Sequence, residues 1–392
     1  MSTVAKQMSL SNVPDAPEVG PLPEQEISVE VLVEKYAKGK ETSVHDVRRR
    51  VALALAANEE EKNRAHWEAK FLWAQENGFV PAGRINSAAG TDLAGGLRFT
   101  SSVSLIVEPA AGSTPILSAI RNAKSSIALE LYLLTDSSFT GALVAARKAG
   151  RDVRVLLEQG PTGVSNNTSY AALQAGGVPV KWASNAYPFT HAKALIVDGA
   201  TLYNMTCNLS VSAFTDNREY VLVDTDPSDV AEASAVFEAD WAMAATPPVS
   251  GLVISPTTAR PKLEKLLAGA AGRLDIEWEA LSDTQIAFRI QERIKAGVAT
   301  RIIVPSNVLG AASQAVLNAL KAVGAQIKLL DKPYIHAKMI LVDGERGFVG
   351  SENATANSLD KNREVGVLWQ NAEVARTLAA TFQSDWTAGT PF

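Results

Sequence analysis

Short apolar runs alternate with segments of helical periodicity along most of the chain. Residues 105–107, 127–134 and 153–157 form apolar runs of strand length, and residues 115–123 and 141–149 between them place apolar side chains at helical spacing. Strands that alternate with helices are typical of a sheet that is covered by helices on both faces. The pattern therefore predicts an α/β fold.

The second half of the chain repeats this order. Its helical and strand-like segments are, in turn, residues 261–268, 274–278, 286–296, 301–304, 315–322 and 327–330. Residues 334–367 also match residues 189–222 position by position, at a constant separation of 336 − 191 = 145. We expect two similar α/β/α sandwich repeats that pack together as an internal pseudo-dimer.

Composition divides the chain into four expected domains. Residues 1–26 contain five prolines or glycines and no apolar period, which predicts a flexible tail. Residues 27–95 show helical spacing and predict a helical N-terminal module. The two repeats are expected at residues 103–245 and 252–392, joined by a short proline-containing linker.

Charge and composition limit the classes of protein to which the chain can belong. The chain has 392 residues, 46% hydrophobic, and a net charge of −5, which is typical of a globular protein and argues against a broad grip on nucleic acid. We find neither a signal-peptide pattern nor an apolar run of roughly 20 residues, and therefore expect a cytoplasmic protein without a transmembrane segment. The single cysteine, Cys207, excludes an internal disulfide and a multi-cysteine metal site.

Polar side chains, rather than apolar ones, recur most clearly between the two matching stretches. The recurring pairs are His191 and His336, Lys193 and Lys338, Asp198 and Asp343, Asn208 and Asn353, and Glu219 and Glu364. A repeat that was kept for packing alone would preserve its apolar period instead. The pairs therefore predict one site that is built from two halves.

Each half offers groups that suit a phosphate. A His-x-Lys sequence leads directly into an apolar run, so that His191 and Lys193 lie on the same side of a strand, as do His336 and Lys338. Imidazole can act as a nucleophile or an acid near neutral pH, and lysine provides a positive charge. With one histidine in each half and no carboxylate identified on the same face, we expect no metal site.

Downstream of each strand, an asparagine and a neighbouring hydroxyl can bind phosphate oxygens. These candidates are Asn208 with Thr206 in the first half and Asn353 with Ser351 in the second. A phosphoryl group in transfer spreads negative charge over its oxygens, so lysine and asparagine donors suit its transition state.

The second copy of this pattern resembles the signature of the phospholipase D superfamily. His336 and Lys338 are followed after four residues by Asp343, and after six more by Gly-Ser-x-Asn, which ends at Asn353. In the first copy, Met205 replaces the glycine, and we expect this change to alter how closely the backbone approaches the phosphate. The resemblance extends from about residue 105 to the C-terminus.

This resemblance implies a phosphodiesterase that needs no cofactor and forms a phosphohistidine. It implies His191 as the nucleophile and His336 as the acid and base. Glu219 and Glu364 each follow Asn-Arg, and we expect each carboxylate to hold an imidazole in its reactive tautomer. Asp198 and Asp343 are also placed around the site, where each either fastens a turn or contacts the substrate.

The amino-acid sequence alone leaves three functions open. The first is hydrolysis of a phospholipid, or transfer of its phosphatidyl group to an alcohol. The second is cleavage of DNA or RNA by the same site, which requires a long basic groove with aromatic stacking. The third is a phosphate-binding module without catalysis. The acidic net charge disfavours the nuclease.

The N-terminal region carries a separate resemblance. Its helical pattern and the sequence PAGRINSAAGT, residues 81–91, are similar to the N-terminal stretch of adenosylcobalamin-dependent ribonucleotide reductases, over residues 27–93. No cysteine precedes Cys207, so radical reduction of nucleotides lacks a thiol. We interpret the region as a helical cap, with a nucleotide-binding or partner-binding module as the alternative. Within it, Ser43 and Asp46 predict a capping-box helix start, and Asn77 followed by glycine predicts a helix stop.

Overall fold

The structure, a computed structural model, describes residues 37, 41–56, 59, 61–77, 96–160, 163–307 and 309–392. The chain separates into two compact units, Met1–Gly96 and Leu97–Phe392. The expected tail and the PAGRINSAAGT segment lie outside the described residues.

The described part of the first unit consists of two α-helices and one short 3₁₀ helix. These elements are α2 (Val44–Ala56), η2 (Glu61–Asn63) and α3 (Arg64–Glu76). The predicted start is confirmed, because Ser43 N donates to Asp46 Oδ2 at 3.0 Å and Asp46 N donates to Ser43 Oγ at 3.1 Å. The predicted stop is confirmed at Asn77, which caps α3.

The described residues of the first repeat form seven strands and five helices. In order they are β1 (Val103–Glu108), α5 (Thr114–Asn122), β2 (Ser126–Leu131), α6 (Ser137–Lys148), β3 (Asp152–Leu157), α7 (Gly163–Ala175), β4 (Val180–Trp182), β5 (Lys193–Val197), β6 (Thr201–Met205), α8 (Val211–Thr215), β7 (Asn217–Asp224) and α9 (Pro227–Trp241). The sheet has the order β1-β7-β6-β5-β2-β3-β4. Strands β2, β3 and β4 are parallel, and β5 returns antiparallel to β2.

The second repeat has the same order and adds two short strands. Its elements are β8 (Val253–Ser255), α10 (Ala259–Ala268), β9 (Arg273–Trp278), α11 (Thr284–Lys295), β10 (Ala299–Val304), α12 (Ala311–Ala322), β11 (Gln326–Leu329), β12 (Tyr334–Ile335), β13 (Lys338–Val342), β14 (Arg346–Gly350), α13 (Ala356–Asp360), β15 (Glu364–Gln370), α14 (Ala372–Ala388) and β16 (Thr390–Pro391). The sheet order is β16-β11-β10-β9-β13-β14-β15-β8, so each strand of the first sheet has a counterpart. The predicted α/β class with two similar repeats is confirmed.

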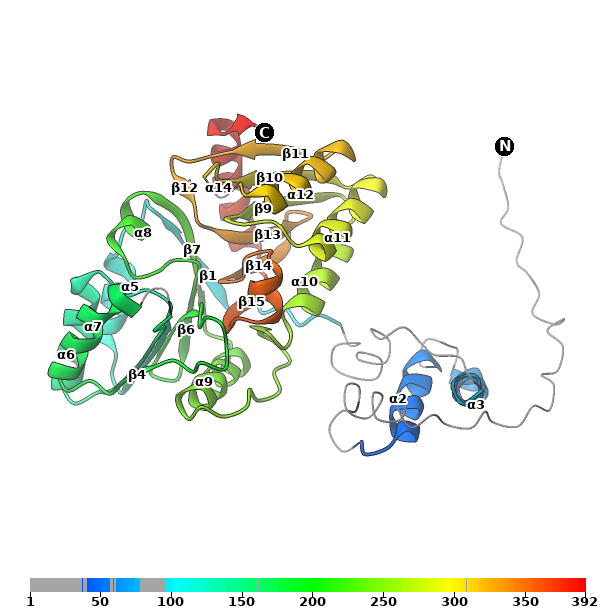
Figure 1. Cartoon of the computed structure of the whole chain (residues 1–392), viewed down its shortest axis with the longest axis horizontal. Coiled ribbons are helices and arrows are strands. Elements are labelled where there is room, and N and C mark those ends of the chain that lie inside the picture. The colour runs from blue at the N-terminus through cyan, green and yellow to red at the C-terminus, as the bar shows by residue number, and fades with distance from the viewer. Residues whose placement is uncertain are drawn as a thin grey trace. The chain divides into compact units, whose positions relative to one another are not determined.

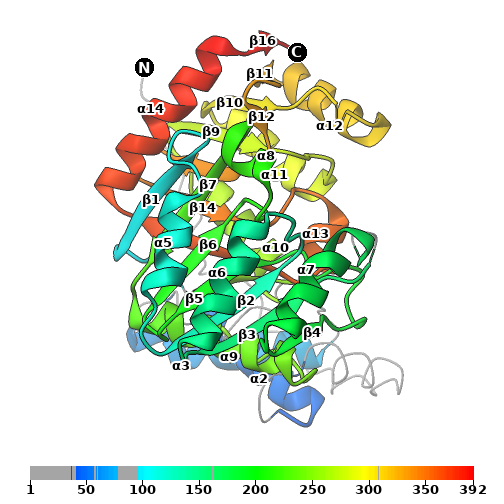
Figure 2. The ribbon, with the colours of Figure 1, turned by 90° about the vertical axis from the view of Figure 1, so that its left-hand side faces the viewer.

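The two repeats lie side by side in Figure 1, one in cyan to green and the other in yellow to red. Helices α5, α6 and α7 lie across the outer face of the first sheet (Figure 2), and apolar side chains such as Ile116, Phe139 and Leu173 fill that layer. The inner faces of both sheets share another core, which includes Tyr220, Met339 and residues of α9 and α14. Each inner face is thus covered by a helix and by the other repeat.

The topology brings corresponding edges of the two sheets to one place. In the first repeat, Lys193 at the start of β5 pairs with Leu131 at the end of β2. In the second, Lys338 at the start of β13 pairs with Trp278 at the end of β9. Strand β12 crosses to the first repeat and pairs with the start of β7. The residues just before β5 and β13 are therefore held at the junction of the repeats.

Candidate active site

Both histidines are fixed by the backbone of the opposite repeat. His191 N donates to Arg363 O at 2.8 Å, and His336 N donates to Arg218 O at 3.3 Å. The side chain of His191 is 14% exposed and that of His336 is 11% exposed. The two imidazoles are thus largely removed from water while their edges remain accessible at the junction.

Each imidazole is held by a carboxylate from the other repeat. His191 Nδ1 lies 2.8 Å from Glu364 Oε2, and His336 Nδ1 lies 2.8 Å from Glu219 Oε1. A proton on Nδ1 that is bound by a carboxylate leaves Nε2 as the reactive nitrogen. The structure therefore brings together all four residues and crosses their pairing between repeats, which the sequence did not indicate.

Both carboxylates are completely buried and have further donors. Glu219 accepts from Thr206 Oγ1 at 2.6 Å, and Glu364 accepts from Ser358 Oγ at 2.6 Å. Burial alone would raise the pKa of each carboxyl group. The charge of the paired histidine and these hydrogen bonds together outweigh the effect of burial. The pKa of Glu219 and that of Glu364 are therefore lowered below the ordinary value. Both groups remain ionised near neutral pH.

The two lysines are also completely buried, and each donates to the carbonyl of its own histidine. The distance from Lys193 Nζ to His191 O is 2.7 Å, and that from Lys338 Nζ to His336 O is 2.5 Å. The pKa of Lys193 is lowered to about 7, mainly by burial and then by the nearby positive charge of Lys338. A nearby anion would favour the charged form of Lys193.

Charged groups from both repeats affect the pKa of His191. Burial lowers its pKa, the carboxylate of Glu364 opposes this shift, and Lys193 and Lys338 reinforce it. Because Lys338 belongs to the second repeat, the two half-sites form one electrostatic unit. The net shift favours the neutral imidazole, which is the form that can act as a nucleophile.

One pair of equivalent positions differs between the halves. Tyr132 follows β2, and its ring packs against His191 with centroids 4.6 Å apart. Glu279 follows β9, and its Oε2 lies 2.8 Å from Lys338 Nζ and 3.5 Å from His336 Nε2. Glu279 is not among the site residues that the sequence predicted.

The two asparagines differ in their hydrogen bonds. Asn353 Nδ2 donates to Glu279 Oε2 at 3.1 Å, and its Oδ1 accepts from Ala280 N at 3.1 Å. Asn208 Oδ1 is buried and has no hydrogen-bond partner among the residues that the structure describes. Asparagine in the first half is thus the less constrained of the two phosphate-binding candidates.

Thr206 and Ser351 do not line the site as expected. Both are completely buried. Thr206 Oγ1 donates to Glu219 and accepts from Tyr220 N at 2.8 Å, and Ser351 Oγ accepts from Val365 N at 3.0 Å. The hydroxyls therefore fix the strands that carry Glu219 and Glu364, and their expected role in binding phosphate stays a prediction.

Asp198 and Asp343 are not brought to the site either. They lie beyond the far ends of β5 and β13, with positive φ angles of 56° and 54°. Asp198 accepts from the amides of residues 124–126 at 2.6–3.0 Å, and Asp343 accepts from those of residues 271–273 at 2.7–3.3 Å. The aspartates of the repeated pattern therefore fasten turns, which confirms one of the two roles expected for them, and only their placement around the site is corrected.

The difference between Met205 and Gly350 is likewise one of packing. A Cβ atom on Gly350 would lie 2.7 Å from Gly366 Cα in the neighbouring strand and 2.3 Å from the buried carboxyl group of Glu352. Met205 faces the first repeat's core. Gly350 is thus required by strand contact, and the expected effect on phosphate approach is not supported.

A buried arginine precedes each catalytic-site glutamate and crosses to the opposite repeat. Arg218 Nη2 donates to Asp385 Oδ1 at 2.9 Å, and Arg363 Nη2 donates to Asp240 Oδ1 at 3.0 Å. Asp240 and Asp385 are separated by 385 − 240 = 145 positions, as the other recurring pairs are, but the sequence does not indicate their arginine partners. These ion pairs fix the segments that position Glu219 and Glu364.

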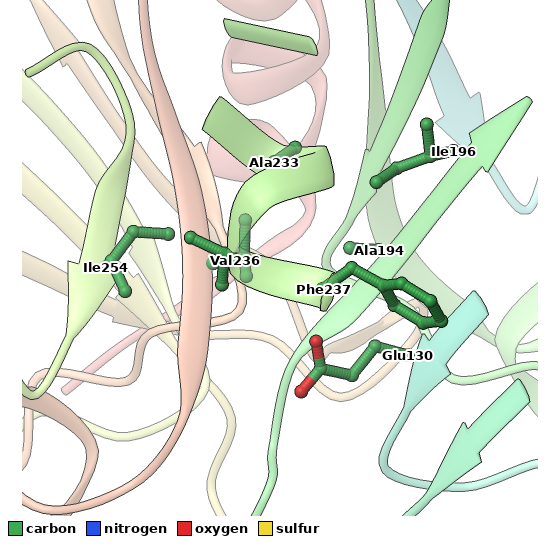
Figure 3. A pocket seen from close by; sticks show the side chains of 8 residues that line it. Glu130, Ala194, Ile196, Ala233, Val236, Phe237 and Ile254 are labelled. Carbon is green, nitrogen blue, oxygen red and sulfur yellow. The ribbon is translucent and has the colours of Figure 1, made fainter. Parts of the chain in front are cut away.

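A buried glutamate lies near each of these ion pairs. Glu130 lines an apolar cavity of about 10 Å³ and lies beside Phe237 (Figure 3). The pKa of Glu130 is raised well above its ordinary value, mainly by burial and then by the negative charge of Asp240. In the second repeat, burial and then Asp385 raise the pKa of Glu277 to about 8. Both glutamates therefore favour the protonated form.

A groove of about 700 Å³ opens next to the site at the junction of the repeats. Its lining includes Arg218, Lys332, Asp216, Asp331, Pro333 and Tyr334. The ring of Tyr334 lies 6.5 Å from that of His336, measured between centroids. The groove thus offers a mixed apolar and polar surface with balanced charges.

In the described part of the chain, no group of three or more His, Cys, Asp or Glu side chains could hold a metal ion. Likewise, none of the described helices is both long enough and apolar enough to span a bilayer.

Fold and site together define a duplicated α/β protein whose repeats each contribute one histidine, one lysine and one carboxylate to a shared site. A family model described as "Cardiolipin synthase, PLD-like domain" matches residues 116–241 and 263–386. The chain belongs to this family of the phospholipase D superfamily, which confirms the resemblance. A second model, "Ribonucleotide reductase, all-alpha domain", matches residues 24–94 and confirms the N-terminal resemblance.

Individual proteins agree with this assignment. The chain is 24% identical over 327 residues to "Probable cardiolipin synthase YwiE" of Bacillus subtilis (strain 168), covering 69% of this chain and 63% of that protein. It is 31% identical over 156 residues to "5'-3' exonuclease PLD3" of Homo sapiens, covering 34% and 31%. The fold matches a phosphatidylserine synthase of Haemophilus influenzae Rd KW20, with a TM-score of 0.59, 13% identity, and coverage of 76% and 89%.

Proposed function

We propose that the protein is a phosphodiesterase of phospholipase D type, which transfers a phosphatidyl group to water or to an alcohol. The observation that carries this proposal is the crossed arrangement of the two His–Glu pairs, His191 with Glu364 and His336 with Glu219. Each pair directs an imidazole Nε2 toward a junction where two buried lysines provide positive charge. This arrangement suits in-line displacement at phosphorus.

In the first step, Nε2 of His191 attacks phosphorus and forms a P–N bond. The bond from phosphorus to the leaving oxygen breaks, and His336 donates a proton from Nε2 to that oxygen. In the second step, His336 takes a proton from water or an acceptor alcohol, whose oxygen attacks phosphorus. The P–N bond then breaks, and its electron pair returns to His191.

The surroundings of the two rings support this division of roles. His191 lies against an aromatic ring and has a lowered pKa, so its neutral form is available for attack. His336 has Glu219 at Nδ1 and Glu279 3.5 Å from Nε2. A carboxylate beside Nε2 suits a ring that carries a proton there and donates it.

A phospholipid is the substrate class that we favour. The family model and the cardiolipin synthase relative support a lipid, although the chain spans only 63% of that relative's length. The groove beside the site carries two acidic and two basic side chains, Asp216, Asp331, Arg218 and Lys332. Such a balance disfavours a nucleic-acid strand, which requires a predominantly basic path.

The proposal is tested with the purified chain and its His191→Ala and His336→Ala variants. The substrates are phosphatidylglycerol vesicles, phosphatidylcholine vesicles, single-stranded DNA and bis-p-nitrophenyl phosphate, all with chelator present. We expect the wild type to turn over lipid and the nitrophenyl ester, and both variants to lose lipid turnover. Turnover of DNA alone would replace lipid with a nucleic-acid substrate. No turnover of any substrate would leave phosphate binding without catalysis.

A further inference from the structure

The carboxylate of Glu279 occupies the place where a phosphate oxygen is expected in the second half of the site. Three nitrogen atoms converge on its Oε2: Lys338 Nζ at 2.8 Å, Asn353 Nδ2 at 3.1 Å and His336 Nε2 at 3.5 Å. These are the same side chains that the repeated pattern provides for a phosphate. An internal anion therefore already binds the donors of this half.

Among the residues that the structure describes, the corresponding donors of the first half, Lys193 and Asn208, have no such carboxylate partner. The residues after β2 and β9 have equivalent backbone positions, since Tyr132 N donates to Ala192 O at 3.1 Å and Glu279 N donates to Ala337 O at 3.0 Å. Where Glu279 binds Lys338, the ring of Tyr132 lies 5.2 Å from Lys193 Nζ. Asn208 Oδ1 also lacks the backbone partner that Asn353 has. The anion is thus specific to the second half.

The surroundings of Glu279 favour its charged form. Its side chain is 19% exposed, and it accepts hydrogen bonds from two side chains. Burial alone would raise the pKa of Glu279, but the charges of His336 and Lys338 lower this pKa well below the ordinary range. A phosphate that approaches Lys338 therefore meets a full negative charge, and either repulsion or displacement of the carboxylate reduces its affinity.

We propose that Glu279 is a built-in competitor for the substrate phosphate. It keeps Lys338 and Asn353 occupied, so that small phosphate anions bind weakly. Only a phosphodiester with additional contacts outside the phosphate, such as the apolar part of a lipid in the neighbouring groove, displaces it. This inference rests on the proposed phosphate site and makes Glu279 a determinant of substrate choice.

The alternative role is a fixed counter-ion that positions Lys338. The two roles predict opposite effects of Glu279→Gln, which keeps the size and a hydrogen-bond acceptor but removes the charge. A competitor that loses its charge allows phosphate to bind more tightly. A positioning residue that loses its charge leaves Lys338 less well placed, and phosphate binds equally or less well.

The test measures binding of inorganic phosphate to the full chain by titration calorimetry. We expect Glu279→Gln, and Glu279→Tyr, which reproduces the first half, to tighten phosphate binding by about tenfold or more. Glu345→Gln removes an equal charge from an exposed turn of the same repeat and should bind like the wild type. Circular dichroism spectra establish that each variant is folded.

An affinity in Glu279→Gln that equals or falls below the wild-type value overturns the inference, as does undetectable binding in both proteins. An equal gain in Glu345→Gln also overturns it, because a general charge effect then accounts for the gain. The measurement needs no turnover, so its result is independent of the proposed catalysis. Lipid turnover with unchanged phosphate affinity would retain the proposed function and reject the competitor.

Discussion

His191 Nδ1 lies 2.8 Å from the carboxylate of Glu364, although the two residues are 173 positions apart and belong to different repeats. The reciprocal pair, His336 and Glu219, has the same distance. Neither repeat alone contains a histidine with its carboxylate. The duplication therefore provides two incomplete half-sites, and packing of the repeats completes both of them.

The first prediction concerns these crossed carboxylates. Glu364→Gln removes the group that orients His191 and stabilises its charged form, and we expect kcat on bis-p-nitrophenyl phosphate to fall by about 100-fold or more. Glu373→Gln, an exposed change at the start of α14, is the matched control and should retain activity. Wild-type kcat in Glu364→Gln would contradict a positioning role.

The second prediction separates the two histidines. Nitrophenolate is a good leaving group that needs little protonation, so His336→Ala should still form the phosphohistidine. We expect a rapid burst of about one equivalent of nitrophenol from His336→Ala, followed by slow release, and no burst from His191→Ala. Stopped-flow absorbance measures both. A burst from His191→Ala in place of His336→Ala would reverse the assigned roles.

The third prediction concerns the acid limb of the pH profile. Attack requires neutral His191, and the pKa of this residue is lowered from its ordinary 6.5. Activity should therefore persist as the pH falls through 6.5 and should decline only below that value. The measurement is kcat/KM against pH, which reports the free enzyme. An acid limb centred above 6.5 would contradict neutral His191 as the nucleophile.

The sequence was sufficient for the fold and for half of the site. Alternation of strands and helices follows from apolar periodicity, and the pairs of histidine, lysine and asparagine were visible as residues that recur at one spacing. The hydroxyls of Thr206 and Ser351 and the carboxylates of Asp198 and Asp343 recur for a different reason, since they hold strands and turns in both repeats. Recurrence alone cannot separate a catalytic side chain from one that fixes the backbone.

The crossing of the pairs and the part played by Glu279 depended on the three-dimensional structure. Glu219 and Glu364 are equidistant in sequence from their own histidines, so spacing gives no sign that each serves the other repeat. Glu279 has no carboxylate counterpart, because Tyr132 stands at its position in the first repeat. A search for recurring residues therefore passes over it.

The fourth prediction concerns the buried arginines. Arg363 is completely buried, and it donates to Asp240 at 3.0 Å and to Ser255 O at 2.8 Å. Arg363→Ala leaves Asp240 as an unpaired buried charge, so we expect the free energy of unfolding to fall by about 3–5 kcal/mol. Arg273→Ala, at a side chain that is 47% exposed, should cost less than about 1 kcal/mol. Urea denaturation measures both, and equal losses would contradict the argument.

The last prediction concerns Glu277, which takes up a proton when the chain folds at a pH between its two pKa values. Burial, and then the charge of Asp385, raise its pKa from 4.5 to about 8, so the folded chain holds a proton that the unfolded chain releases. Stability from this group is present below pH 4.5 and is lost as the pH rises toward about 8. Glu277→Gln cannot titrate, so its free energy of unfolding should decline less across this range. Each unit of pKa difference corresponds to about 1.4 kcal/mol, which sets the largest difference in slope per pH unit. Urea denaturation of both proteins at several pH values measures the slopes, and parallel slopes would show that Glu277 is already ionised in the folded state.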